Sequence, residues 1–124
     1  MPEFGRGVWR NTPYPLSREN LRGRPVLVDF WDYSCVNCVR SLPYLRAWHE
    51  RYHEHGLVII GVHTPEFRFG MAQGAVDGAI ARFELPYAVL LDNDEESWQR
   101  FKAEWLDVSE AEYQAKLRAR GAAR

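Results

Sequence analysis

A run of apolar residues that leads into two closely spaced cysteines constrains the fold of this chain more than any other feature. Residues 26–31 read Val-Leu-Val-Asp-Phe-Trp, a run rich in β-branched and aromatic residues that is typical of a buried strand in a parallel sheet. A polar bend at residues 32–34 follows, and a helical pattern then begins at Cys35 and Cys38, the two cysteines of the chain. The sequence therefore predicts a strand, a bend and a helix, with both thiols at the start of the helix.

The amino end of a helix favours a negatively charged sulfur. Backbone N–H groups of the first turn have no partner within the helix, and the positive end of the helix dipole lies there. We expect the thiolate of Cys35 to be stabilised relative to the thiol, so that it is a nucleophile near neutral pH. Two residues between the cysteines bring the sulfurs within reach of a disulfide, with Cys38 turned toward the protein. The pair is predicted to cycle, with one sulfur that attacks and one that resolves.

The same motif has two alternative interpretations. A C-x-x-C pair can supply half of a tetrahedral zinc site, but such a site needs two further ligands and the chain has no second cysteine pair. Two of the histidines lie well down the predicted helix from the cysteines, so we predict no metal site. A structural or inert disulfide is the second alternative, and the strand, bend and helix context favours redox chemistry over both. The four histidines are His49, His53, His55 and His63.

The segment VDFWDYSCVNC, with a proline at position 43, resembles the active-site segment of the thioredoxin superfamily. The wider pattern over residues 9–101, which includes PLSRENLRGRPVLVDFW, GLVIIGVHTPEF and LLDND, resembles the TlpA/ResA-type redoxins, in particular the thioredoxin-like domains of DipZ-type and NHL-repeat-containing proteins. This resemblance implies an α/β fold of the thioredoxin type, with three layers (α/β/α) of which the middle one is a mainly parallel sheet. It also implies a thiol–disulfide oxidoreductase that exchanges electrons with protein disulfides and requires no organic cofactor or metal.

The resemblance also implies roles for individual residues. Asp29 stands six residues before Cys35, like the buried aspartate of thioredoxins, which accepts the proton of the second cysteine through water. Carried over, Asp29 is the general base that activates Cys38, with a pKa raised by burial. An aspartate that faces solvent at a strand edge is the alternative. The expected supporting residues are Trp31, Tyr33, Asn37 and Pro43, of which Trp31 matches a buttressing aromatic residue and Pro43 the proline that kinks the helix.

The remaining strands and connections are predicted from periodicity. Residues 1–17 form an extended lead-in anchored by Trp9. A second buried strand covers residues 57–63, parallel to the first because a helix connects them, and a third covers residues 87–91. The loop after the second strand carries His63 and Glu66, which are further candidates for groups around the site.

Three helices are predicted before residue 109. The first runs from Cys35 to about His55 and ends at Gly56, and the second covers residues 71–84. The third follows a capping segment at residues 92–96. The side chains expected to face the sheet from the first and third helices are Val39, Leu42, Leu45, Trp48 and Tyr52, and Trp98, Phe101 and Trp105.

The resemblance ends after Phe101. The cis-proline loop, β-hairpin and final helix of the family are missing, and residues 109–124 instead predict an extra capped helix with a short tail. The first strand would then have an unpaired edge, which proteins avoid. We expect the extra helix to cover this edge or a second copy to pair with it in a homodimer, unless the fold is incomplete. Because the cis-proline loop holds substrate, the alternative function is a non-catalytic thioredoxin-like interaction or assembly module.

Composition excludes several classes of function. The chain is 46% hydrophobic, which suits a single domain over residues 1–124, and its formal net charge of −1 does not indicate binding to nucleic acid or to an anionic membrane. No stretch is long and apolar enough for membrane insertion, and no secretory signal is evident. We therefore expect a cytoplasmic protein whose partners are protein thiols and disulfides and a thioredoxin-type or membrane reductant that the sequence does not identify. Peroxidase chemistry at Cys35 is disfavoured because the Pro-x-x-x-Thr-x-x-Cys context is absent.

Overall fold

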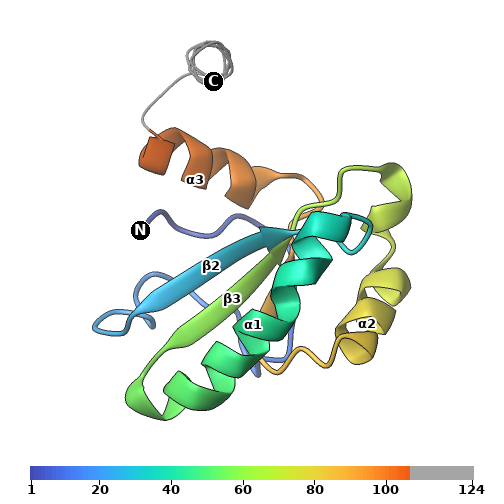
Figure 1. Ribbon diagram of the computed structural model, residues 1–124. Coiled ribbons are helices and arrows are strands. Elements are labelled where there is room, and N and C mark those ends of the chain that lie inside the picture. Colours follow the sequence, from blue (N-terminus) through green and yellow to red (C-terminus); the bar gives the residue numbers. More distant parts are fainter. Residues whose placement is uncertain (107–124) are drawn as a thin grey trace, which may run out of the picture.

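A four-stranded mixed sheet lies at the centre of the computed structural model, which describes residues 1–106 (Figure 1). The strands are β1 (Val8–Arg10), β2 (Val26–Trp31), β3 (Val58–His63) and β4 (Ala88–Leu91), in the spatial order β1-β4-β3-β2. The three strands β2, β3 and β4 are parallel, and β1 runs antiparallel to β4. The predicted α/β architecture with a mainly parallel sheet is therefore confirmed. The predicted helix within residues 109–124 lies outside the described residues.

Helices cover both faces of this sheet. The α-helices are α1 (Val36–Tyr52), α2 (Gln73–Arg82) and α3 (Glu96–Leu106), and short 3₁₀ turns cover His53–His55 and Arg68–Met71. Side chains of α1 and α2 pack with Trp31, Ile59 and Val89 in one core. On the other face, Phe101 of α3 packs with Ile60, Leu90 and the N-terminal lead-in. Figure 1 shows α1 and α2 together on one side of the sheet and α3 on the other.

Strand β2 shows how the sequence pattern places the site. It pairs in register with β3, from Val26 opposite Val58 to Trp31 opposite His63. Because side chains alternate along a strand, Leu27 and Trp31 join the core below α1, whereas Val26, Val28 and Phe30 join the core below α3. Asp29 therefore faces α1. Within residues 1–106, β2 pairs with β3 alone, so its outer edge has no strand partner in the described part of the chain.

Two predictions about packing need correction. Trp48 and Tyr52 were expected to face the sheet, but they are 45% and 43% exposed. The inner face of α1 instead follows Cys38, Leu42, Leu45 and His49, at spacings of four, three and four residues. His49 is half-buried. The predicted stripe continued from Leu45 to Trp48 at a spacing of three residues, but the helix brings the residue four positions after Leu45, His49, to its inner face.

The lead-in and the helix ends also differ in detail from expectation. Residues 8–10, predicted only as extended, form β1, because the edge of β4 supplies backbone partners that no local pattern reveals. The long predicted helix divides into α1 and the 3₁₀ turn, and Gly56 ends this turn in a left-handed conformation (φ 99°), which glycine adopts at little cost.

Asp92 links the end of β4 to α3. Its carboxylate is fully buried and accepts hydrogen bonds from the backbone N–H groups of Ser97 and Trp98, at 2.9 and 3.0 Å, and from the hydroxyl of Thr64 at 3.0 Å. It therefore satisfies free N–H groups in the first turn of α3, as its place in the predicted capping segment suggests.

We expect Asp92→Ala to lower the free energy of unfolding by about 2 kcal/mol, because three donors lose their partner, two of them at a helix start. Urea unfolding monitored by circular dichroism measures the change. The matched control is Asp94→Ala, since Asp94 is an exposed residue of the same loop. Equal stability of the two variants would show that Asp92 does not cap α3.

Candidate active site

The two cysteines lie where β2 ends and α1 begins. Cys35 is the N-cap residue of α1, with extended backbone angles, and its sulfur accepts a hydrogen bond from the backbone N–H of Cys38 at 3.3 Å. The Cys38 thiol donates to the Cys35 sulfur at 2.6 Å. Both thiols are free and half-buried. The capping contact places the Cys35 sulfur against the unpaired N–H groups of the helix, where negative charge is stabilised.

Cys38 is held in its protonated form. Burial raises the pKa of its thiol to about 11, helped by the hydrogen bond to Cys35 and by the negative charge of Asp29, and opposed by a backbone hydrogen bond from Asp32. At neutral pH this thiol is therefore not a nucleophile, and it needs a base to become one.

Asp29 places a carboxyl group near this thiol. It faces α1 from the middle of β2, and burial raises the pKa of its carboxyl group. Its Oδ2 atom is buried and has no hydrogen-bond partner among the described residues. Since its charge acts on the Cys38 thiol, the two groups lie within electrostatic reach of one another. A carboxylate without partners gains stability when it accepts a proton.

The bend before Cys35 is held by a second carboxylate, that of Asp32, which is 4% exposed. It accepts hydrogen bonds from the backbone N–H groups of Ser34 at 3.1 Å and Glu66 at 2.8 Å. Burial acts to raise the pKa of Asp32, but the backbone N–H groups of Glu66 and Ser34 and the Ser34 side chain outweigh it, so the pKa lies below its ordinary value. Asp32 is therefore a charged anchor for the bend.

His63 completes this anchor from the end of β3. It is fully buried, and its Nε2 atom accepts a hydrogen bond from the backbone N–H of Tyr33 at 3.2 Å. Burial lowers the pKa of His63, against the opposing charge of Asp32, whose Oδ1 atom lies 3.6 Å from Nε2. A nitrogen that accepts from an N–H group is unprotonated, so we interpret the contact with Asp32 as one to a neutral ring rather than as an ion pair.

The predicted supporting residues differ in where they lie. Trp31 is 2% exposed and packs edge-on against His63, with ring centroids 4.9 Å apart, and Tyr33 stacks on the same ring at 5.5 Å. Asn37 is exposed in the first turn of α1. Pro43 is exposed further along α1 and lines a different hollow, so the structure does not bring it to the cysteines.

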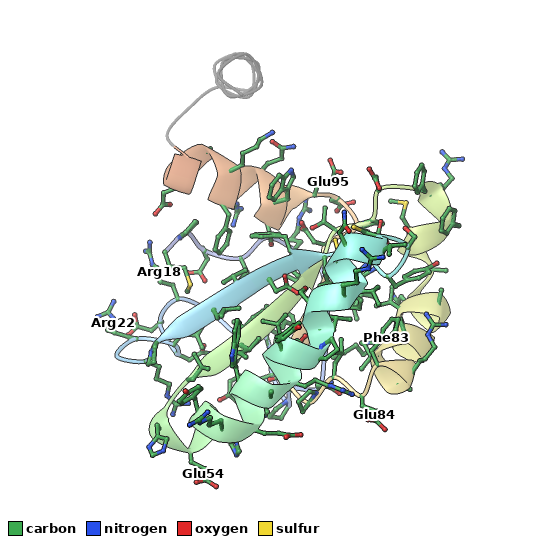
Figure 2. All side chains as sticks on the ribbon, in the orientation of Figure 1. Arg18, Arg22, Glu54, Phe83, Glu84 and Glu95 are labelled. Carbon is green, nitrogen blue, oxygen red and sulfur yellow. The ribbon has the colours of Figure 1, made fainter. Side chains whose placement is uncertain are left out.

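A groove of about 330 Å³ opens beside both sulfurs. One side is apolar, with the rings of Phe30 and Trp98 in edge contact at 5.1 Å, and Glu66 and Glu95 contribute carboxylates to its lining. Figure 2 labels Glu95 near the start of α3, above the end of β2. The lining residues are Phe30, Trp31, Asp32, Cys35, Cys38, Thr64, Pro65, Glu66, Glu95 and Trp98.

Sequence reasoning left the bend without a firm role for Asp32 and missed the contributions of Tyr87 and Trp98. The polar bend and the position of His63 at a strand end gave partial signals. Tyr87 was assigned only to a strand, although the hydroxyl of a buried tyrosine usually has a hydrogen-bond partner. Nothing in the local sequence indicated that Trp98 of α3 would line the groove, because that contact depends on how α3 packs on β2.

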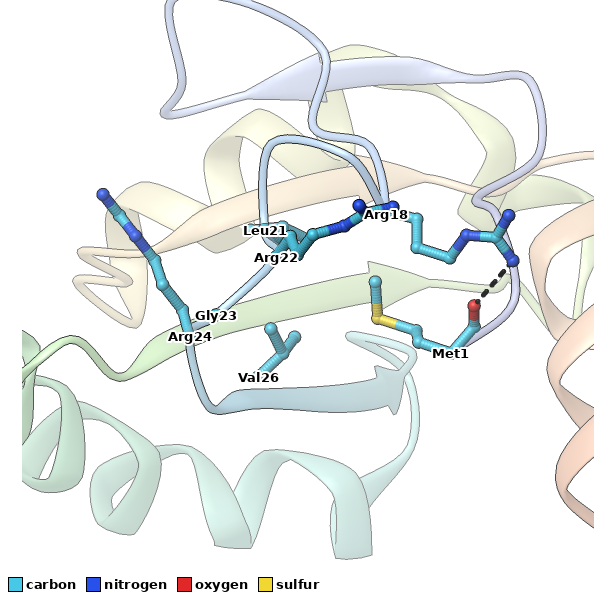
Figure 3. Close-up of a pocket in the computed structure, with 7 residues that line it drawn as sticks. All are labelled: Met1, Arg18, Leu21, Arg22, Gly23, Arg24 and Val26. Atoms are coloured by element: carbon cyan, nitrogen blue, oxygen red, sulfur yellow. Dashed lines mark hydrogen bonds between the residues drawn. The ribbon is translucent and has the colours of Figure 1, made fainter.

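A larger hollow of about 460 Å³ lies at the opposite end of β2 and is lined by Met1, Leu21, Val26 and three arginines. Figure 3 shows that the arginine side chains do not converge: Arg18 points to the carbonyl of Met1, at 3.5 Å, whereas Arg24 points away. No cysteine, histidine or carboxylate lines this hollow, so it carries none of the predicted chemistry.

Within residues 1–106, no three histidine, cysteine or acidic side chains gather as ligands for a metal ion. None of the helices in that part of the chain combines the length and the apolar character needed to cross a membrane.

A mainly parallel sheet, with a C-x-x-C motif at the start of the helix that follows β2, defines a thioredoxin-like protein with a dithiol site. Comparison with known families agrees: the model of the Redoxin family matches residues 1–122, and the chain belongs to that family. The predicted membership of the TlpA/ResA-like redoxins and the thioredoxin-like fold are thereby confirmed.

Relatives include DipZ of Mycobacterium tuberculosis, 42% identical over 96 residues, which are 76% of this chain and 14% of DipZ. NHL repeat-containing protein 2 of Homo sapiens is 35% identical over 105 residues, 82% of this chain and 14% of that protein. Thiol-disulfide oxidoreductase YkuV of Bacillus subtilis is 27% identical over 108 residues, 86% of this chain and 71% of YkuV. The chain thus spans about a seventh of the first two relatives.

Solved structures show the same fold. A thioredoxin-like protein in its oxidized form superposes with a TM-score of 0.73 at 26% identity, covering 84% of this chain and 70% of that one. A secreted Mycobacterium tuberculosis disulfide oxidoreductase superposes with a TM-score of 0.61 at 23% identity, covering 73% of this chain and 63% of that one.

The raised pKa of Asp29 predicts how stability depends on pH. Between the unfolded-state pKa, about 3.9, and the higher folded-state pKa, the folded protein binds more protons than the unfolded one, so stability falls as pH rises through this window. We expect Asp29→Asn to be more stable than the parent above the window, and the difference to vanish near pH 4.

Urea unfolding of the reduced protein at a series of pH values measures this dependence, with Asp94→Asn at an exposed position as the control. A difference between Asp29→Asn and the parent that is equal at pH 4 and pH 8 would contradict a buried, ionising carboxylate.

Proposed function

We propose that this chain is a thiol–disulfide oxidoreductase that exchanges its Cys35–Cys38 dithiol with disulfides of other proteins. The observation that carries the proposal is that the two cysteines of the pair have different surroundings. Cys35 caps a helix beside an open groove, whereas the half-buried Cys38 is protonated near Asp29, whose Oδ2 atom has no hydrogen-bond partner among the described residues. Cys35 is thus placed to attack a substrate disulfide, and Cys38 to resolve the mixed disulfide that forms.

The proposed reaction has two exchange steps. The Cys35 thiolate attacks a substrate disulfide; a Cys35–substrate S–S bond forms, the substrate S–S bond breaks, and one substrate sulfur leaves as a thiolate. Cys38 then gives its proton to Asp29, and the resulting thiolate attacks the Cys35 sulfur. The Cys35–Cys38 disulfide forms, and the second substrate sulfur leaves as a thiolate. The substrate gains two electrons, which the dithiol loses, and the reverse sequence oxidises a dithiol.

The groove supports a polypeptide substrate. Its apolar side, formed around Phe30 and Trp98, suits side chains that flank a cysteine, and Glu66 and Glu95 favour neutral or basic segments over acidic ones. No organic cofactor enters the proposed steps, because the electrons reside in the sulfur pair.

A non-catalytic interaction module is the second candidate. The observation in its favour is the outer edge of β2, which has no strand partner within residues 1–106 and could pair with a second copy of the chain. Analytical ultracentrifugation of the reduced chain tests this homodimer, and a sedimentation coefficient of a monomer at all concentrations would rule it out.

Insulin reduction by dithiothreitol, with the chain as catalyst, tests the oxidoreductase proposal. We expect Cys35→Ser to abolish catalysis, and Cys38→Ser to attack once and accumulate a mixed disulfide that mass spectrometry detects. Asp29→Asn should form the mixed disulfide at the parental rate but resolve it roughly 10²-fold more slowly at pH 7, the usual effect of losing a general base.

Ser41→Ala is the control for a change beside the motif, since the Ser41 hydroxyl donates a hydrogen bond to the backbone carbonyl of Cys38 and not to either sulfur. If the parental chain neither reduces insulin nor forms a mixed disulfide, the result would favour the interaction module. Resolution by Asp29→Asn at the parental rate would remove Asp29 from the mechanism and leave the cysteine chemistry intact.

A further inference from the structure

Besides His63 Nδ1, four buried polar atoms remain without hydrogen-bond partners on the face of the sheet that α1 covers. They are Asp29 Oδ2, Trp31 Nε1, Tyr87 OH and His49 Nδ1, and none of them has a partner among the described residues. Leaving such a group unsatisfied costs free energy, and buried groups are usually bonded to protein or to ordered water. Neighbouring buried polar groups that lack protein partners are commonly bridged by ordered water.

Gly61 brings three of these groups to one place. It lies in β3 directly opposite Asp29 of β2. A Cβ atom on Gly61 would lie 3.0 Å from Trp31 Nε1 and 3.2 Å from the Cε1 atom of Tyr87. The missing side chain therefore lets the indole N–H and the phenol ring approach the backbone beside the carboxylate. The charge of Asp29 also raises the pKa of Tyr87, after the larger effect of burial, which agrees with this proximity.

Helix α1 adds the fourth group. Cys38 and His49 lie on its inner face, eleven residues or roughly 16 Å apart along the axis. The His49 ring centroid is 6.2 Å from that of Tyr87, and its Nδ1 atom is buried although the residue as a whole is only half-buried. Burial, and then the neighbouring His53, lower the pKa of His49, so the ring is neutral at pH 7 and Nδ1 is free to accept a proton.

We propose that Asp29, Tyr87 and His49, joined by buried water, form a proton exit that leads from Cys38 along the underside of α1 to the surface. This inference rests on the proposed function, because it concerns the proton that Asp29 accepts during resolution. It gives that proton a way out while a substrate still occupies the groove on the other side of the cysteines.

The transfer is balanced at each atom. The Cys38 S–H bond breaks, its electron pair stays on sulfur and the proton moves to a carboxylate oxygen of Asp29. Asp29 then passes a proton to water, Tyr87 accepts one at its oxygen as its own proton moves to His49 Nδ1, and His49 releases its Nε2 proton to solvent. The net result is one proton delivered outside, with the carboxylate and the phenol restored and the imidazole left as its Nδ1–H tautomer, which must return to the Nε2–H form by proton exchange before the next turnover.

Other charged and titratable groups face this route. From α1 these are Cys35 and Arg46, whose guanidinium acts to lower the pKa of Tyr87 while it donates to the Phe83 carbonyl and to Glu84, both labelled in Figure 2. From β3, His63 lies beside Trp31 with its Nδ1 atom unpartnered among the described residues. His53 stacks on His49 at 4.8 Å. Arg46 keeps a positive charge near the phenol, which helps the oxygen to release its proton.

The test follows resolution in the full chain, starting from a mixed disulfide of Cys35 with thionitrobenzoate. Cys38 attack releases the coloured thiolate, and its rate is measured from pH 5 to pH 9. We expect Tyr87→Phe, which removes the hydroxyl and keeps the ring, to slow release roughly tenfold at pH 7, less than the loss expected for the base itself. We expect the deficit to disappear at high pH, where hydroxide removes the proton directly.

His49→Ala supplies the second variant, at a half-buried position that tolerates truncation. Added imidazole should restore its rate and leave that of Tyr87→Phe unchanged, because only the first lacks the terminal imidazole. Tyr44→Phe and His55→Ala, both at exposed positions, are the controls and should match the parent. Circular dichroism establishes that each variant is folded.

The outcomes separate the two proposals. If parental resolution is fast and depends on Asp29, but Tyr87→Phe and His49→Ala have the parental rate and pH profile, the proton exit is wrong and the oxidoreductase function stands. If both variants are slow at every pH and imidazole restores neither, their roles are structural and the exit is again wrong. If the parental mixed disulfide never resolves, the proposed function itself fails.

Discussion

The contact between the Cys35 sulfur and the first turn of α1 is the interaction on which the rest of the site depends. As N-cap, this sulfur accepts the N–H of Cys38, and so it begins the helix and holds the two sulfurs together in one geometry. The bend that delivers Cys35 is fixed in turn by Asp32 and His63, through the backbone N–H groups of Ser34, Glu66 and Tyr33. The nucleophile is thus positioned by backbone contacts rather than by a flexible side chain.

Two aspartates three residues apart have opposite environments, and this difference assigns their roles. Asp32 is surrounded by hydrogen-bond donors, which lower the pKa of its carboxyl group, so it is charged at neutral pH. Asp29 faces α1 with one oxygen unpartnered among the described residues, and burial raises its pKa. The first arrangement stabilises the fold, whereas the second destabilises it at neutral pH in return for a carboxyl group that can accept a proton. In the proposed mechanism the half-buried Cys38 thiol must lose a proton, and the destabilising carboxylate of Asp29 beside it meets that need.

Local patterns predicted most of the framework, because β2, the bend and α1 each have a clear sequence signal, and the spacing of Cys35 and Cys38 places both at the start of α1. Features that depend on packing were less accessible. Strand β1 forms because backbone groups at the edge of β4 are available to pair with it. His49 faces inward because it, rather than the exposed Trp48, lies on the same side of α1 as Leu45. Tyr87 approaches Asp29 because Gly61 has no side chain. Each of these depends on residues that are distant in the sequence, and no single window of the chain contains them.

The central claim is that a carboxylate buried below Cys38 takes its proton, and the most direct measurement is the titration of Asp29 by NMR of its side-chain ¹³C carboxyl group in the reduced protein. The account predicts that Asp29 titrates well above the ordinary value of about 3.9, and that Cys38→Ala changes this titration because the two groups interact. An Asp29 that titrates near 3.9, and does so whether or not Cys38 is present, would contradict it.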